Sequence, residues 1–121
     1  MKILYVENHS VFAESVSRLF LSRHNVVIVP TISAALNELR GGGFDLLIAD
    51  YDLDDGKGDE LLRLLQVSTI PISVIGASSH AEGNAALLKA GASAICSKME
   101  FDGIQAVIDK VISTSAGALE S

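Results

Sequence analysis

The stretch FDLLIADYDLDDGKG, residues 44–58, decides the fold. Within it, residues 45–50 form a short apolar run bounded by carboxylates, which predicts a strand buried on both faces and ending in an acid. Aspartate and glycine dominate the residues that follow, a composition typical of an exposed turn. Open α/β sheets bind their ligands beyond the carboxyl ends of their strands, so Asp50 is the first candidate for a functional residue.

The composition suits a single domain over residues 1–121, in which we expect residues 113–121 to form a frayed tail. The chain is 49% hydrophobic but only 5% aromatic, which favours an aliphatic core under a helix-covered parallel sheet. Nine basic residues against 15 acidic ones give a net charge of -6, so we expect no nucleic-acid binding by this domain. The single cysteine, Cys96, excludes an internal disulfide and is expected to be an inert core thiol.

No apolar run in the sequence approaches the length that a membrane span requires, and the N-terminal residues lack the pattern of a signal peptide. We therefore expect a cytoplasmic protein without membrane association.

Hydrophobic periodicity divides the chain into five strands and five helices. The strands are expected at residues 2–6, 26–29, 45–50, 71–75 and 94–97, and the helices at residues 10–20, 34–39, 60–65, 85–90 and 102–112. Ser10 is a candidate N-cap for the first helix, and Thr31 or Ser33 for the second. Gly41–Gly43 should end the second helix, and Pro71 should open the fourth strand.

Strands that alternate with helices predict an α/β fold whose parallel sheet is covered on both faces. We expect a flavodoxin-like, doubly wound (βα)5 three-layer sandwich with strand order 2-1-3-4-5. That order places Glu7 and Asn8, which follow the first strand, beside Asp50. It also brings Gly76 and Lys98, at the ends of the fourth and fifth strands, to the same crevice.

Two carboxylates that face an ammonium across a crevice have two alternative uses. Oxygens from Glu7, Asp50 and a backbone carbonyl near Asp52, with water completing the shell, suit Mg²⁺. Asp50 could then attack a phosphoryl group, while the metal and Lys98 balance the charge on the transferred oxygens. The alternative use is a plain surface ion pair. The signalling interpretation requires that these side chains meet in a wet notch, with Asp50 open to solvent.

Four segments together resemble the receiver domains of two-component response regulators, over nearly the whole chain. These segments are ILYVEN (residues 3–8), DLLIADYDLDDGKG (45–58), PISVIGAS (71–78) and KAGASAICSK (89–98). The resemblance implies a phosphorelay signalling protein, not an enzyme beyond Mg²⁺-dependent self-phosphorylation and slow autodephosphorylation.

The resemblance also assigns roles to individual residues. It implies that Asp50 is the phosphoacceptor and that the metal, Mg²⁺, is faced by Glu7, Asn8 and Asp50 and by the backbone carbonyl of Asp52. It further implies that Lys98 contacts the phosphoryl group, as does the backbone at Ala77.

Partners follow from the same resemblance. The donor would be a histidine kinase or a phosphotransferase, and a downstream protein would bind the face formed by helix four, strand five and helix five. A homodimer through helices four and five is expected at the family level.

Two departures from the family pattern concern the metal and the backbone. Asn8 stands where receivers usually carry a second acid, so we expect weaker Mg²⁺ binding than in typical receivers. Met99 stands where a proline, commonly joined by a cis bond, usually follows the lysine. Because a cis bond without proline costs about 2.5–4 kcal/mol, we predict that Lys98–Met99 is trans.

Two further departures concern the switch positions. Gly76 replaces the usual Thr or Ser, so it offers no hydroxyl to a phosphoryl oxygen unless Ser78 or Ser79 reaches back. Ile95 replaces the usual switch aromatic and cannot make the usual rotamer change. Two interpretations stay open: an atypical receiver that is phosphorylated on Asp50, or a degenerate receiver that acts as a phosphorylation-independent protein-interaction module.

Other acidic motifs fit less well. Asp50-Tyr51-Asp52 resembles the D-x-D of haloacid-dehalogenase-type phosphatases, but that motif normally ends the first strand of a larger domain. An EF-hand loop that started at Asp50 would need Gly at its sixth position and Glu at its twelfth, which are Asp55 and Leu61 here. Three scattered histidines predict no metal site. The remaining acids are expected to form a solvated rim near the third helix, namely Asp54, Asp55, Asp59 and Glu60.

Overall fold

A five-stranded parallel sheet in the order β2-β1-β3-β6-β7 forms the centre of the molecule. The computed structural model describes residues 1–120, and the side chains of residues 1–114. The strands are β1 (Lys2–Val6), β2 (Asn25–Val29), β3 (Leu46–Ala49), β6 (Ser73–Gly76) and β7 (Ala94–Ile95). In sequence order these are strands 2-1-3-4-5, so the predicted order and the predicted parallel pairing are confirmed.

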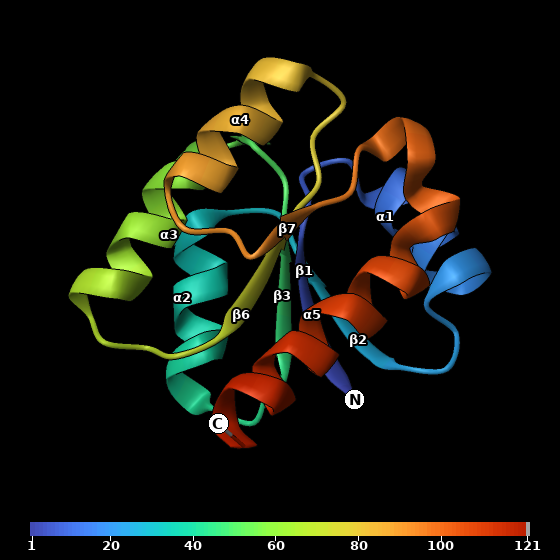
Figure 1. Ribbon diagram of the computed structural model, residues 1–121. Helices are drawn as coiled ribbons and strands as arrows, with labels where there is room; N and C mark the ends of the chain where they lie inside the picture. Colours follow the sequence, from blue (N-terminus) through green and yellow to red (C-terminus); the bar gives the residue numbers. More distant parts are fainter. Residues whose placement is uncertain (121) are drawn as a thin grey trace.

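Helices cover both faces of this sheet, as Figure 1 shows. The elements are α1 (Ser10–Phe20), α2 (Ile32–Gly41), α3 (Gly58–Val67), α4 (Ala81–Lys89), the 3-10 helix η1 (Lys98–Gly103) and α5 (Ile104–Glu120). α2, α3 and α4 lie on one face, whereas α1, η1 and α5 lie on the other (Figure 1). The predicted three-layer, doubly wound sandwich is therefore confirmed.

Each face of the sheet has its own apolar core because strand side chains alternate in direction. Leu4 and Val6 of β1 pack in the core under α2, α3 and α4. Ile3 and Tyr5 of the same strand pack in the core under α1 and α5. All four side chains are fully buried, as expected for a strand in the middle of a helix-covered sheet.

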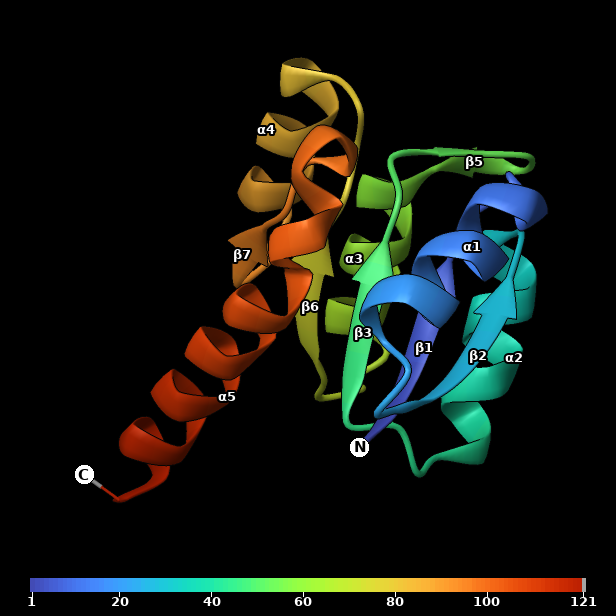
Figure 2. The ribbon, with the colours of Figure 1, turned by 90° about the vertical axis from the view of Figure 1, so that its right-hand side faces the viewer.

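The segment after β3 contains a hairpin that the sequence analysis did not predict. β4 (Asp52–Leu53) and β5 (Gly56–Lys57) pair antiparallel, and Figure 2 shows this hairpin at the carboxyl ends of the parallel strands. Acidic and glycine residues gave no alternating apolar signal, so the pattern indicated only a turn.

Two predicted strands differ from the structure by more than one residue at an end. β6 begins at Ser73, so Pro71 precedes the strand and does not open it. β7 contains only Ala94–Ile95, and Lys98 begins η1 after a gap, although the strand was predicted to reach residue 97.

The predicted N-cap was wrong for α1 and correct for α2. His9, not Ser10, is the N-cap of α1, and its side chain makes no capping bond. Thr31 caps α2, because its hydroxyl accepts a hydrogen bond from Ala34 N–H at 3.1 Å. Gly42 follows that helix with φ of +77°, a conformation that glycine adopts without strain.

α5 extends to Glu120, beyond the predicted end at Ile112. Ser121 lies outside the described residues, and the fraying of residues 113–121 stays a prediction. Within residues 1–120, no helix combines the length and apolar composition needed to cross a membrane.

Candidate functional site

Three charged side chains meet beyond the carboxyl ends of the parallel strands. Glu7 follows β1, Asp50 follows β3, and Lys98 begins η1. The Lys98 ammonium lies 2.5 Å from Glu7 Oε1 and donates a hydrogen bond to Asp50 Oδ2 at 3.0 Å. The structure thus brings together the three residues that the strand order predicts to converge.

Backbone hydrogen bonds that continue the sheet hold two of these residues in place. Glu7 N–H donates to Val29 O at 2.9 Å, and Asp50 N–H donates to Val6 O at 3.0 Å. The sheet therefore fixes the backbone that carries both carboxylates, and the carboxylates themselves accept from His9 N–H at 3.1 Å and Tyr51 N–H at 2.7 Å.

The predicted wet notch is wrong. Asp50 is only 3% exposed and Glu7 only 1%. The Lys98 side chain, itself 12% exposed, lies against both acids, and its ammonium is 5.4 Å from the centre of the Phe12 ring. The Asp50 carboxylate is thus buried, with the Lys98 ammonium in direct contact with it.

Burial and neighbouring charges determine the protonation of this cluster. Burial raises the pKa of Asp50 to about 6, with a contribution from Glu7, while the hydrogen bond from Lys98 acts in the opposite direction. Burial alone would lower the pKa of Lys98, but its hydrogen bonds with Glu7 and Asp50 outweigh burial and raise it. Lys98 therefore stays charged, and a second cation at this site would relieve the remaining negative charge.

Asn8 directly follows Glu7 after β1, and a hydrogen bond orients its side-chain amide. Its Nδ2 donates to Asp54 Oδ1 at 3.3 Å, whereas its buried Oδ1 finds no hydrogen-bond partner among the described residues. Oxygens of Glu7, Asp50 and Asn8 form a donor set of the kind that Mg²⁺ takes, together with water. The residues present therefore fit a divalent cation.

Asp52 lies in the hairpin with its side chain engaged elsewhere. Its exposed carboxylate pairs with Lys57, and this hydrogen bond lowers the pKa of Asp52. A metal contact by the Asp52 backbone carbonyl stays a prediction.

Gly58 is a residue whose contribution the sequence analysis missed. Its N–H donates to Tyr51 O at 2.6 Å, and any Cβ at this position would overlap the backbone carbonyl of Asp50. Only glycine lets the N-terminus of α3 pack this closely on the residue after β3. The second glycine of the GKG run was the sequence feature that could have indicated this close packing.

Asp55 is exposed, as predicted for the acidic rim, but it serves the N-terminus of α2 and not that of α3. Its two carboxylate oxygens accept hydrogen bonds from Ile32 N–H at 2.8 Å and Ser33 N–H at 3.1 Å, so Asp55 caps α2. No local pattern could reveal this, because the capped helix begins 23 residues earlier in the chain.

The two switch positions pack against each other. Gly76 and Ile95 are partners in the β6–β7 register. A Cβ on Gly76 would lie 2.7 Å from Ile95 Cδ1 and 3.0 Å from Leu87. The space beside Gly76 is thus filled by apolar side chains.

The residues after Gly76 make internal contacts. Ala77 N–H, part of the backbone predicted to contact a phosphoryl group, donates to Ala49 O at 2.9 Å. The Ser78 hydroxyl accepts from His80 N–H at 3.2 Å and lies 2.5 Å from where a Cβ on Gly83 would be. Ser78 therefore faces α4 and does not reach back to Asp50.

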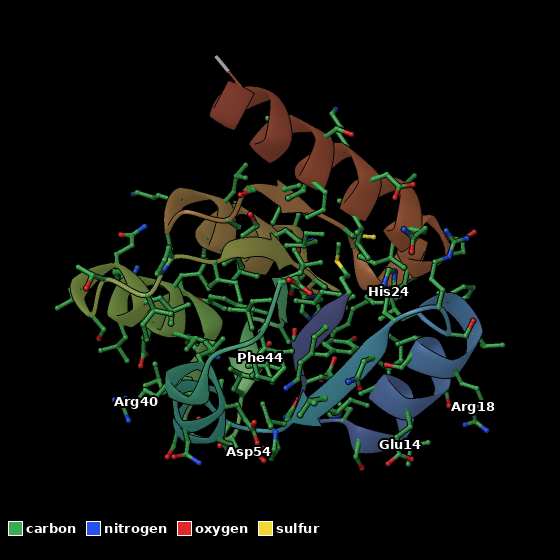
Figure 3. The ribbon with its side chains drawn as sticks, turned by 90° about the horizontal axis from the view of Figure 1, so that it is seen from below. Glu14, Arg18, His24, Arg40, Phe44 and Asp54 are labelled. Carbon is green, nitrogen blue, oxygen red and sulfur yellow. The ribbon has the colours of Figure 1, made fainter. Side chains whose placement is uncertain are left out.

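Cys96 and His24 make contacts that are typical of structural residues. Cys96 is buried, and burial raises its thiol pKa, in line with an inert thiol. His24 lies near α5 and bonds Gln105 at 2.7 Å (Figure 3). Among the described residues no group of three His, Cys, Asp or Glu side chains is arranged to hold a metal, and no peptide bond is cis, as predicted for Lys98–Met99.

Comparison with models of known protein families identifies the family of this chain. The model of the response regulator receiver domain matches residues 3–109. The chain belongs to this family. Receiver domains act in phosphorelay signalling and are generally not enzymes. They generally bind Mg²⁺ at an acidic pocket, and they interact with histidine kinases or phosphotransferases and with downstream effectors.

Individual relatives support the same assignment. The receiver is 34% identical over 101 residues to the swarming motility regulation protein RssB of Serratia marcescens, covering 81% of this chain and 46% of that protein. The chain therefore spans about half the length of this relative. Its fold matches the receiver domain of a LuxO repressor protein from Vibrio parahaemolyticus, with TM-score 0.84, 21% identity and coverage of 99% and 97%. It also matches a CheY-like receiver from Methanospirillum hungatei, with TM-score 0.80, 23% identity and coverage of 96% and 97%.

Proposed function

We propose that this receiver accepts a phosphoryl group on Asp50 from a histidine kinase or phosphotransferase, in the cytoplasm. The observation that supports this most is the contact of one ammonium, Lys98, with both Glu7 and Asp50 beyond the strand ends. A carboxylate held beside a cation at this edge is suited to nucleophilic attack on a phosphorus atom.

Asp50 would act as an anion. Because burial raises its pKa to about 6, the carboxylate is mostly ionised above pH 7. One of its oxygens forms a bond to phosphorus while the bond between phosphorus and the donor's histidine nitrogen breaks. The electron pair of the broken bond stays on that nitrogen, which takes up a proton from solvent. Lys98 follows the transferred oxygens and balances their charge.

Glu7, Asn8 Oδ1, Asp50 and the Asp52 carbonyl would hold Mg²⁺. When bound, this cation neutralises charge on the phosphoryl oxygens. Asn8 contributes a neutral oxygen in place of a charged one, so we expect weaker binding than in typical receivers.

Transmission from the site would differ from the usual route. Gly76 has no hydroxyl, and Ile95 and Leu87 occupy the space beside it. We propose that a downstream protein still binds the face made of α4, β7 and α5, where a homodimer could also form, and that movement of Lys98 and η1 signals the change.

A second candidate function is a phosphorylation-independent interaction module. The burial of Asp50, which is 3% exposed, and the packed Gly76–Ile95 contact favour it. Such a module would keep one conformation whatever its partner kinase does.

Incubation with Mg²⁺ and acetyl phosphate, followed by intact mass measurement, separates the two functions. Phosphorylation predicts the mass of one added phosphoryl group, absent in Asp50→Asn and present in the matched control Asp109→Asn. No adduct with acetyl phosphate or phosphoramidate, and no beryllofluoride complex, would favour the interaction module.

A further inference from the structure

The Asn8 side chain has two ends in different surroundings. Its Nδ2 donates to Asp54 Oδ1, and its Oδ1 is buried without a hydrogen-bond partner among the described residues. A carboxylate only accepts hydrogen bonds, so Asp54 fixes which end of the amide faces it. The oxygen is consequently the end that faces away from Asp54.

A buried oxygen without a partner is uncommon in folded proteins and calls for an explanation. Asn8 directly follows Glu7 at the end of β1, and Glu7 shares Lys98 with Asp50. A hard cation bound beside these carboxylates would be the missing partner of the Asn8 oxygen. An amide oxygen is a ligand type that Mg²⁺ accepts.

From these contacts we infer that Asp54 is a positioning residue for the divalent cation of this receiver. It orients the Asn8 amide oxygen toward the metal. Its carboxylate, which Asn8 Nδ2 contacts, also supplies a negative charge in place of the one that Asn8 lacks. This inference rests on the proposed metal-dependent function of the site. It assigns a role to Asp54, which the acidic composition alone had indicated to be part of a solvated rim.

The hairpin holds Asp54 where this role requires it. Asp54 lies in the turn between β4 and β5. Its neighbour Asp55 is bonded to two N–H groups of α2, and Asp52 is paired with Lys57 across the hairpin. The turn is therefore attached on both sides, and Asp54 does not depend on a flexible loop for its position.

Outer residues that orient a metal ligand commonly change metal affinity when they are replaced. Asp54→Ala removes both the acceptor and the charge, whereas Asp54→Asn keeps an oxygen that can still accept from Asn8. Glu82 provides a matched control, because it is an exposed acid in the first turn of α4, at the same end of the sheet. Glu82→Ala removes the same charge without touching Asn8.

The test is a titration of the full chain with MgCl₂, followed by ¹H–¹⁵N NMR without any phosphodonor. We expect Asp54→Ala to raise the dissociation constant about 10-fold, Asp54→Asn to raise it less, and Glu82→Ala to change it less than about twofold. The Asn8 side-chain amide resonances should shift on Mg²⁺ addition in the unmodified protein. Thermal unfolding of each variant shows that the fold is retained.

Three results would overturn the inference: no Mg²⁺ binding by the unmodified chain, an unchanged affinity in Asp54→Ala, or an equal loss in Asp54→Ala and Glu82→Ala. The proposed phosphorylation is judged separately by the mass measurement. Phosphorylation with an unchanged affinity in Asp54→Ala refutes only the inference, whereas the expected affinities without any phosphoryl adduct refute only the proposed function.

Discussion

Two neighbouring places at the same edge of the sheet are filled in opposite ways. Around Asp50, two buried carboxylates share one ammonium, and an amide oxygen is left without a partner. Around Gly76, an isoleucine and a leucine fill the space. Under the proposed function, the residues around Asp50 would accept the phosphoryl group, whereas those around Gly76 offer no hydroxyl that could contact it. The comparison teaches that the charged groups and the residues packed beside Gly76 can vary independently in one fold.

The largest expected effect tests the packing of α3 against the backbone of Asp50. Gly58→Ala should lower the free energy of unfolding by about 3 kcal/mol or more, because its Cβ would overlap the backbone carbonyl of Asp50. Gly41→Ala is the matched control: a Cβ there meets nothing within 4 Å, and alanine favours the end of α2 by up to about 1 kcal/mol. Denaturation with urea measures both. Equal stabilities for the two variants would show that α3 does not pack closely on Asp50.

Removing the shared cation should have the next largest effect. Lys98→Met leaves Glu7 and Asp50 buried without their ammonium, which should cost about 3 kcal/mol at pH 7. The loss should shrink as the pH falls and a carboxylate takes up a proton. The exposed Lys89 provides a control, since Lys89→Met should change stability little. Unfolding curves at pH 5 and pH 7 test this, and a Lys98→Met loss that does not depend on pH would argue against a charged pair.

Neutralising Asp50 should stabilise the resting protein. Burial raises the folded-state pKa of Asp50 from 3.8 to about 6, so the folded protein binds the proton more tightly than the unfolded chain. Stability contributed by this group therefore falls as pH rises from about 4 to about 6. Asp50→Asn should raise the free energy of unfolding by on the order of 2–3 kcal/mol at pH 7.5 in EDTA, and this increase should vanish below about pH 4. A gain that persists at low pH would contradict the buried-carboxylate account.

The smallest effect concerns the apolar place. Gly76→Ser should cost about 1–2 kcal/mol, because its Cβ would lie 2.7 Å from Ile95 Cδ1. Ile95→Ala should make room for that side chain, so the double variant should be about 1 kcal/mol more stable than the sum of the single effects predicts. Strict additivity in a double-mutant cycle would show that the two positions do not share one space.

Local apolar patterns made the fold predictable from the sequence. Residues 2–6 and 46–49 are nearly continuous apolar runs, and glycines follow the helices, so element type and strand order could be inferred. Convergence of Glu7, Asp50 and Lys98 then followed from the order of the strands. Helix and strand ends were less predictable, because contacts with distant residues set them.

Contacts between distant residues account for what could not be predicted. The capping of α2 by Asp55 joins residues 23 positions apart, and neither local sequence signals the other. The surroundings of Asp50 include the Lys98 side chain, which lies over the Phe12 ring, and these three residues are far apart in the sequence. The packing of Ile95 on Gly76 likewise depends on the register of two strands.

The measurement that tests the central claim most directly is a methyl and amide NMR spectrum of the receiver before and after addition of Mg²⁺ and beryllofluoride. We predict large shifts for the amide of Tyr51, which donates to Asp50 Oδ1 at 2.7 Å, and for the amide of Lys98, whose side chain contacts Asp50. We predict no comparable shift for the δ1 methyl of Ile95. A spectrum that does not change around Asp50, or a large displacement of the Ile95 methyl resonance, would contradict the account.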